Sequence, residues 1–184
     1  MRLLGSTDRE VSRHAWYLTV AFAFAIHNAE EATTAPSLLQ FMQSSAPLAL
    51  RAFYEGINAS ELRVSLTVLT FLGFVATTFA ARSPHSPRWA YVMLVFAAVI
   101  GVNALAHLVL ASIFRTYMPG LITAVIVTLP VAAMTLLRAR HEKWVASTAY
   151  WTVLPAALLV HGPVLALFIE TTIGTFRLLT GSAA

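Results

Sequence analysis

The sequence predicts an all-α polytopic membrane protein, a bundle of five transmembrane helices with its N-terminus in the cytoplasm. Three observations predict this fold. The 184-residue chain is 58% hydrophobic and 11% charged, with a mean hydropathy of +0.74, whereas soluble domains are about half apolar and about a quarter charged. Four segments are apolar over about 20 residues, the length that crosses a bilayer. Lysine and arginine are divided unevenly between the connecting segments.

The four apolar segments are expected to form helices over residues 62–81, 89–114, 119–137 and 150–170. The connections "ARSPHSPRW" and "RARHEKW" are basic and aromatic, as is typical of the membrane interface. Three prolines, Pro130, Pro155 and Pro163, favour kinks that open space between helices. Together with the first helix, these elements predict one integral membrane domain over residues 1–184.

The first helix is less obvious, because its apolar run from Ala15 to Ile26 is short. Twelve residues make about 18 Å of helix, too little for a hydrocarbon core of about 30 Å. A cleaved signal peptide is the alternative, but acidic residues on both sides of the run fit poorly with one. We therefore expect a helix over residues 15–34, which places His27, Glu30 and Glu31 inside the membrane.

The charges support five spans. With five helices, eight basic residues fall on the side of the N-terminus and four on the other side. Without the first helix the division becomes five against seven, which disagrees with the positive-inside rule. The eight are Arg2, Arg9, Arg13, Arg82, Arg88, Arg138, Arg140 and Lys143, and the four are Arg51, Arg63, Arg115 and Arg177. The expected location is the inner cell membrane, and the outer loop over residues 35–60 is expected to be interfacial or re-entrant.

Polar and ionisable residues within membrane spans are costly and usually face the interior of the bundle. They lie here on the first, third and fifth helices: His27, Glu30, Glu31, Asn103, His107 and His161. These helices run in the same direction, and a rise of 1.5 Å per residue puts the six residues within about two turns of one level, in the middle or outer half of the membrane. Residues three and four apart share a helix face, so we expect them to converge on one site.

Two motifs in this set resemble a known family. Residues 27–31 spell H-x-x-E-E, and Asn103 with His107 spells N-x-x-x-H. In this order and placement they resemble the HXXEE family of small bacterial and archaeal membrane proteins, and "YMPGLITA" at 117–124 resembles a further element of that family. The resemblance implies a membrane-embedded helical core but no particular activity.

Histidine and carboxylate side chains in a dry bundle suit a divalent transition metal, with zinc or iron favoured. We expect His27, His107, His161 and one glutamate, Glu30 or Glu31, as ligands of one ion, since two ionised glutamates neutralise one divalent charge. The other glutamate is expected to act as a general base. Asn103 is expected to orient a ligand or bind substrate, and Tyr117 to donate a proton.

The predicted function is a metal-dependent enzyme, a hydrolase, isomerase or oxidoreductase, acting on a lipid-like or isoprenoid-like substrate at bilayer depth. Three alternatives remain: a metal-free His/Glu acid–base isomerase, a metal- or ion-binding transporter or sensor, and a purely structural hydrogen-bond network. The expected partners are the bilayer, the ion and a lipid-like substrate. No dense basic run indicates nucleic acid, and the absence of cysteine excludes disulfides and thiolate ligands.

Overall fold

The structure is a computed structural model that describes residues 4–181, with side chains described from Arg13 onward. Arg2 and the ends of the predicted domain, 1–3 and 182–184, lie outside the described residues, as does the side chain of Arg9. Between residues 4 and 181 the chain forms helices and turns and no strand. In chain order the elements are α1 Leu4–Thr33, α2 Ala35–Ser44, α3 Leu48–Tyr54, α4 Ala59–Arg82, α5 Pro87–Phe114, α6 Leu121–Thr123, η1 Ala124–Thr128, α7 Leu129–His141, η2 Ser147–Ala149, α8 Tyr150–Leu159, η3 Val160–Val164 and α9 Leu165–Thr180.

Four helices are long and apolar enough to cross a membrane, in agreement with the four apolar segments of the sequence. They are Ala59–Arg82, Pro87–Phe114, Leu121–His141 and Ser147–Thr180. The third begins at Leu121 rather than at residue 119, because Pro119 and Gly120 form a turn in which Gly120 has φ +89°. The helices Leu121–His141 and Ser147–Thr180 each contain a wide π-helical turn, η1 and η3 respectively. Each turn contains a proline or precedes one closely, and proline is a common cause of local distortion in helices.

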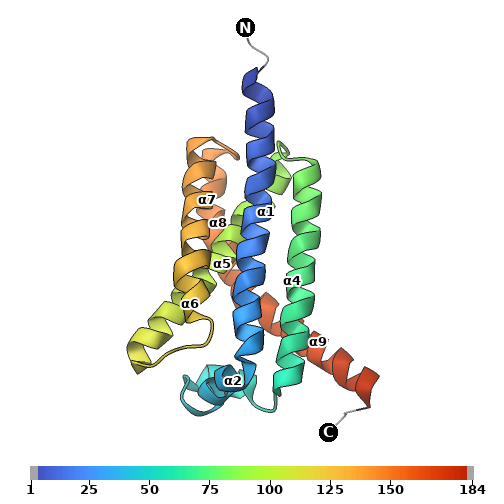
Figure 1. The fold of residues 1–184 in the computed structure, drawn as a ribbon, viewed down its shortest axis with the longest axis vertical. Helices are drawn as coiled ribbons and strands as arrows, with labels where there is room; N and C mark the ends of the chain where they lie inside the picture. The colour runs from blue at the N-terminus through green and yellow to red at the C-terminus, as the bar shows by residue number, and fades with distance from the viewer. Residues whose placement is uncertain (1–3, 182–184) are drawn as a thin grey trace.

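Helix α1 packs mainly on α4 and lies between α4 and α7 in the view of Figure 1. Its buried residues Tyr17, Val20, Phe24 and His27 follow helical spacing, so one face is covered by neighbouring helices. The helix is uninterrupted from Leu4 to Thr33, about 45 Å of helix. His27, Glu30 and Glu31 therefore belong to the same helix as the apolar run before them.

The last long helix crosses the bundle at an angle. Its first part, α8, packs on α5, and its last part, α9, packs on α4 and emerges beyond it (Figure 1). Arg177 of α9 fixes this crossing, because its guanidinium binds the Glu61 carboxylate of α4 at 2.7 Å and 3.1 Å and the Gly56 carbonyl at 2.8 Å. Glu61 also closes a capping box with Asn58 at the start of α4.

The predicted outer loop, 35–60, forms two short helices that pack on each other and close one end of the bundle (Figure 1). Helix α2 follows α1 almost directly and buries Leu38, Leu39 and Met42. These side chains belong to an apolar cluster with Leu62 of α4 and Ile169 of α9. The two helices thus form a cap over this end of the bundle, called the α2–α3 cap below.

Candidate functional site

The polar residues predicted from the sequence lie between two separate apolar clusters. One cluster takes residues 17–24 from α1 and 90–100 from α5. The other lies toward the α2–α3 cap and includes Leu38 and Ile169. On α1 and α5, the stretches between the two clusters contain the H-x-x-E-E and N-x-x-x-H motifs. Between these two clusters the interior of the bundle is polar along the described parts of α1 and α5, at the level that the helical arithmetic predicts.

His27, Glu31 and His107 form the centre of this level. The Glu31 Oε1 atom lies 2.9 Å from His107 Nε2 and 3.6 Å from His27 Nε2. The two imidazole rings stand edge to face with centroids 5.0 Å apart. His27 and His107 are buried, and potential ligand atoms of the three residues all lie within 4.8 Å of one another.

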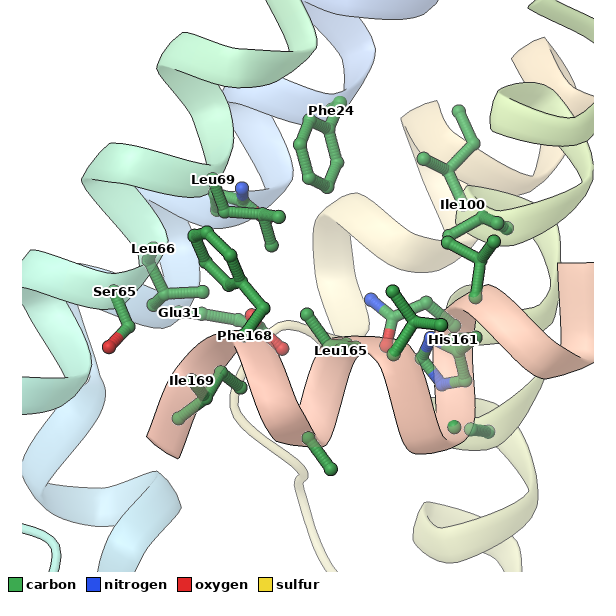
Figure 2. A pocket seen from close by; sticks show the side chains of 18 of the residues that line it. Phe24, Glu31, Ser65, Leu66, Leu69, Ile100, His161, Leu165, Phe168 and Ile169 are labelled. Carbon is green, nitrogen blue, oxygen red and sulfur yellow. The ribbon is translucent and has the colours of Figure 1, made fainter. Parts of the chain in front are cut away.

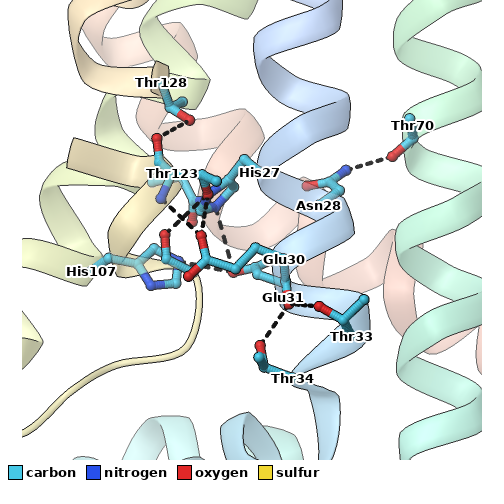
Figure 3. Close-up of polar contacts among 12 residues, drawn as sticks. His27, Asn28, Glu30, Glu31, Thr33, Thr34, Thr70, His107, Thr123 and Thr128 are labelled. Carbon is cyan, nitrogen blue, oxygen red and sulfur yellow. Dashed lines mark hydrogen bonds and ion pairs between the residues drawn. The ribbon is translucent and has the colours of Figure 1, made fainter. Parts of the chain in front are cut away.

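Glu30 turns away from this centre and binds helix α6 and the connection before it (Figure 3). Its Oε2 accepts hydrogen bonds from the Thr123 amide at 2.8 Å and the Thr123 hydroxyl at 2.6 Å, and its Oε1 accepts one from Tyr117 at 2.7 Å. Neighbouring residues on a helix point about 100° apart. The adjacent glutamates can therefore take different roles.

Thr123 links Glu30 to His27, because its Oγ1 also lies 3.0 Å from His27 Nδ1. The hydroxyl proton is donated to Glu30, so Oγ1 accepts the proton of His27 Nδ1. His27 Nε2 is then the unprotonated nitrogen, and it accepts a hydrogen bond from Asn103 at 2.6 Å. This chain of bonds fixes both the ring orientation and the tautomer of His27.

His161 is the last of the predicted residues, and Asn28 is a further polar residue of α1 near the site. The Asn28 amide donates to Thr70 of α4 at 2.7 Å. His161 lies in the π-helical turn η3 and faces the same cavity as Glu31 (Figure 2), near enough to Glu31 and His107 to interact electrostatically with both. Wide turns of this kind are frequent at functional sites. The predicted residues thus gather in one region, with His161 across the cavity.

A cavity of about 740 Å³ adjoins the site, within the range of about 300–1,000 Å³ typical of small-molecule pockets. Its polar lining includes Glu31, Asn103, His107 and His161, and its remaining walls are mostly apolar (Figure 2). His27, Glu30, Tyr117 and Thr123 do not line it. The site therefore has two layers, one facing the cavity and one behind it.

Tyr117 reaches this rear layer from the surface, since its side chain is 50% exposed. It lies in the connection between α5 and α6, outside the helices that can span a membrane. Partial burial, together with its hydrogen bond to the Glu30 carboxylate, raises the pKa of the Tyr117 phenol to about 12. The phenol is therefore protonated at neutral pH and holds Glu30 by donating its proton.

Two residues essential to this geometry were not among the predicted site residues: Thr123 and Gly120. A Cβ on Gly120 would lie 2.8 Å from His107 Cε1 and 3.1 Å from Glu31 Cγ, so only glycine lets this turn approach the site so closely. Its φ of +89° also favours glycine. Both residues fall in "YMPGLITA", the one signal in the sequence that pointed to this segment.

The cluster fits a divalent ion in several respects. Ligand atoms at about 2.0–2.2 Å from a tetrahedral ion lie about 3.3–3.6 Å apart. The 3.6 Å between Glu31 Oε1 and His27 Nε2 matches this spacing, whereas the 2.9 Å between Glu31 Oε1 and His107 Nε2 is a hydrogen-bond distance that an ion would lengthen. The fixed tautomer of His27 leaves Nε2 unprotonated, although Asn103 must release its hydrogen bond there. His107 Nδ1 is buried without a hydrogen-bond partner among the described residues, a rarity for which a bound ion or water is one explanation.

Comparison with known proteins agrees with the motifs. The family described as "Protein of unknown function with HXXEE motif" matches residues 18–135. A relative in Bacillus subtilis (strain 168), the uncharacterized protein YrkK, is 26% identical over 152 residues, which cover 81% of this chain and 89% of the relative. No solved structure matches the chain. The matched range contains every site residue described above except His161.

Proposed function

The chain belongs to the HXXEE family, a family of unknown function, and from its site we propose that it is a metal-dependent enzyme embedded in a membrane. In this proposal α1 crosses the membrane in addition to the four apolar helices, which makes five spans. The N-terminus is cytoplasmic, and the α2–α3 cap lies on the outer side of the inner membrane. The site then sits in the outer half of the bilayer. Its substrate is lipid-like or isoprenoid-like.

One observation carries the proposal: two histidines and a carboxylate from α1 and α5 converge within 4.8 Å beside a cavity. Ionisable groups at bilayer depth are expensive to insert and usually serve a function. Imidazole and carboxylate are ligands that zinc and iron accept readily. Glu31 is the one described carboxylate that lines the cavity, which favours one ion over two.

Each residue has a distinct role in this proposal. His27, Glu31 and His107 hold the ion, with His161 across the cavity as a further ligand. Glu30 and Thr123 act on His27 from behind, because they fix the tautomer in which Nε2 is free to bind. Such outer hydrogen bonds commonly orient histidine ligands and increase their basicity.

The remaining polar groups serve the substrate. Asn103 faces the cavity beside His27 and, once it releases Nε2, is free to hydrogen-bond a polar substrate group. Tyr117 restrains Glu30 at the surface side. A bound ion supplies Lewis acidity or an activated water, and the apolar walls exclude competing bulk water.

A second candidate function is metal-free acid–base catalysis by the same residues. It is favoured by the continuous hydrogen-bond chain from Tyr117 through Glu30 and Thr123 to His27 and Asn103, which is complete without an ion. Histidine and carboxylate side chains in an apolar cavity are common general acids and bases. In that case Glu31 and His107 transfer protons at the cavity wall.

Elemental analysis of protein purified gently in detergent separates the two candidates. The metal proposal predicts close to one ion per chain in the wild type and a near-complete loss in His27→Ala and Glu31→Gln. A wild-type content far below half an ion per chain would reject it in favour of acid–base chemistry. Unchanged metal in both variants would mean that the ion binds elsewhere.

A further inference from the structure

The cavity beside the site continues well beyond the polar residues as an apolar channel between α4 and α5. Along α5 it is lined from Asn103 down to Val92, and along α4 it reaches Ala76. Eleven residues of helix correspond to about 16 Å, roughly half of a hydrocarbon core of about 30 Å. We call this part, lined by Gly73, Ala76, Val92, Val95, Phe96 and Val99, the apolar arm.

The apolar arm is open at the side of the bundle. Leu72 of α4, Val92 of α5 and Val164 of η3 line the cavity, yet they are 45%, 40% and 48% exposed. Side chains that both line a cavity and face outward mark its opening. In a membrane this opening faces the lipid chains, whereas the α2–α3 cap covers the end of the cavity with Leu38, Met42 and Tyr54.

A glycine on α4 lets an aromatic wall of the arm pack closely against this helix. A Cβ on Gly73 would lie 3.1 Å from Phe96 and 3.2 Å from Phe24, so the ring pair packs directly against the glycine. The two rings stand edge to face, 5.2 Å apart, and form a wall of the arm. One turn further along α4, the small residue Ala76 also lines the cavity.

The charges around the cavity restrict what binds at its polar end. Among the described residues that line it, none is lysine or arginine, and the one charged group is the carboxylate of Glu31. Phosphate and diphosphate groups are normally held by arginine, lysine or helix N-termini. The available side-chain partners are instead amides, imidazoles and hydroxyls, which suit an uncharged hydroxyl or carbonyl group. In the proposed function the Glu31 carboxylate already offsets part of the charge of the bound ion, which leaves less of it to attract a phosphate.

We propose that the cavity binds a single-chain lipid with an uncharged polar end, such as a long-chain or isoprenoid alcohol, aldehyde or ester. The chain enters sideways between α4 and η3 and lies in the apolar arm. Its polar end reaches Glu31, His107 and His161. This inference deepens the proposed function, on which it rests for the position of the reacting group.

Photolabelling with hexadecanol that carries a diazirine at the end of its chain tests this directly, in protein reconstituted into phosphatidylcholine nanodiscs. Mass spectrometry is expected to map the label to the peptides around Ala76 and Val92. Excess hexadecanol should remove it, and hexadecyl phosphate at the same concentration should not. Equal competition by the phosphate, or label spread evenly over the lipid-facing surface, would overturn the proposal.

Two matched variants show whether the arm holds the chain. Val99→Trp fills the arm beside the polar site, whereas Val109→Trp changes an exposed valine of the same helix that does not line the cavity. Site-specific labelling is expected to fall roughly tenfold or more in the first, the scale on which apolar pockets discriminate by size, and to stay unchanged in the second. Equal labelling in both would contradict the assignment.

Two additions keep the test independent of folding and of the ion. Ala76→Phe fills the far end of the arm from α4 and should also reduce labelling. The unfolding temperatures of Val99→Trp and Ala76→Phe are compared with that of the wild type, so that a loss of labelling is not mistaken for a loss of folding. Labelling does not require catalysis, so it should persist in wild-type protein whose metal has been removed with EDTA. Failure of labelling with normal metal binding would reject the lipid alone, and labelling without metal binding would reject the metal proposal alone.

Discussion

Glu31 of α1 and His107 of α5 meet at 2.9 Å in the interior of the bundle, at the edge of the cavity. Both residues belong to the sequence motifs that identify the family, yet the motifs are 76 residues apart when counted from His27 to Asn103. Their contact joins two helices at the level where the apolar core is interrupted.

Replacing Thr123 with valine removes the hydroxyl between Glu30 and His27 while keeping the shape of the side chain. We expect zinc affinity to fall about 10- to 100-fold, as is typical when an outer hydrogen-bond partner of a histidine ligand is lost. Isothermal titration in detergent measures it. Thr78→Val is the control, because the Thr78 hydroxyl bonds a carbonyl of its own helix away from the site. Equal affinity in both variants would remove Thr123 from the site.

Alanine at Gly120 should damage the site more than alanine at Gly56. Both glycines have positive φ, +89° and +75°, so both substitutions carry a backbone cost of about 1–3 kcal/mol. At Gly120 the new Cβ also collides with His107, whereas at Gly56 nothing lies within 4 Å. Thermal unfolding and metal content together measure the effect. Similar losses of stability, with metal retained in both, would contradict the close packing on His107.

Arg177→Met should detach α9 from α4 and leave the Glu61 carboxylate, 3% exposed, without its cation. We expect the unfolding temperature to fall, by less than when a fully buried pair loses one partner, because Arg177 is itself 35% exposed. Adding Glu61→Gln should restore part of the stability, since glutamine keeps the capping position. Arg88→Met, at an exposed arginine, serves as control. No recovery in the double variant would argue against an unpaired charge as the cause.

Glu142 should make stability depend on pH. Burial favours its neutral form, but hydrogen bonds from Trp144 at 2.8 Å and Arg138 at 2.7 Å outweigh burial and hold the pKa of the Glu142 carboxyl below its usual 4.5. A lowered folded-state pKa stabilises the fold above the unfolded value, and this contribution disappears as pH falls through the folded value. Glu142→Gln should therefore lower the unfolding temperature at neutral pH and match the wild type in acid.

The reverse pattern would contradict this assignment. A difference between wild type and Glu142→Gln that grows as the solution is acidified would mean that the carboxyl is stabilised in its protonated form. Glu55→Gln is a suitable control, because Glu55 is an exposed carboxylate at the end of α3.

The sequence allowed the polar level to be predicted because helical rise is regular. Counting 1.5 Å per residue along helices of the same direction brings His27, His107 and His161 to similar depth, and the structure places them around one region. The four apolar helices were predictable for the same reason, since length and hydropathy determine which segments can cross a membrane. Their exact ends depended on local turns, such as the one at Gly120.

The division of roles between Glu30 and Glu31 was not predictable in this way. Their directions on α1 differ by about 100°, but which of the two faces the cavity depends on how α1 is rotated against α5 and α6. Thr123 was missed because a threonine in an apolar helix usually bonds its own backbone, as Thr78 does. The apolar arm arises from the crossing of the last helix and from Gly73, features that hydropathy does not record.

Zinc titration of Glu31→Gln beside Glu30→Gln tests the central claim most directly, because the two variants make the same chemical change at adjacent residues. The arrangement predicts that Glu31→Gln abolishes stoichiometric binding, since Glu31 faces His27 and His107. Glu30→Gln should still bind one ion, about 10- to 100-fold more weakly. Undiminished binding in Glu31→Gln, or a greater loss in Glu30→Gln, would contradict a metal centre built on His27, Glu31 and His107.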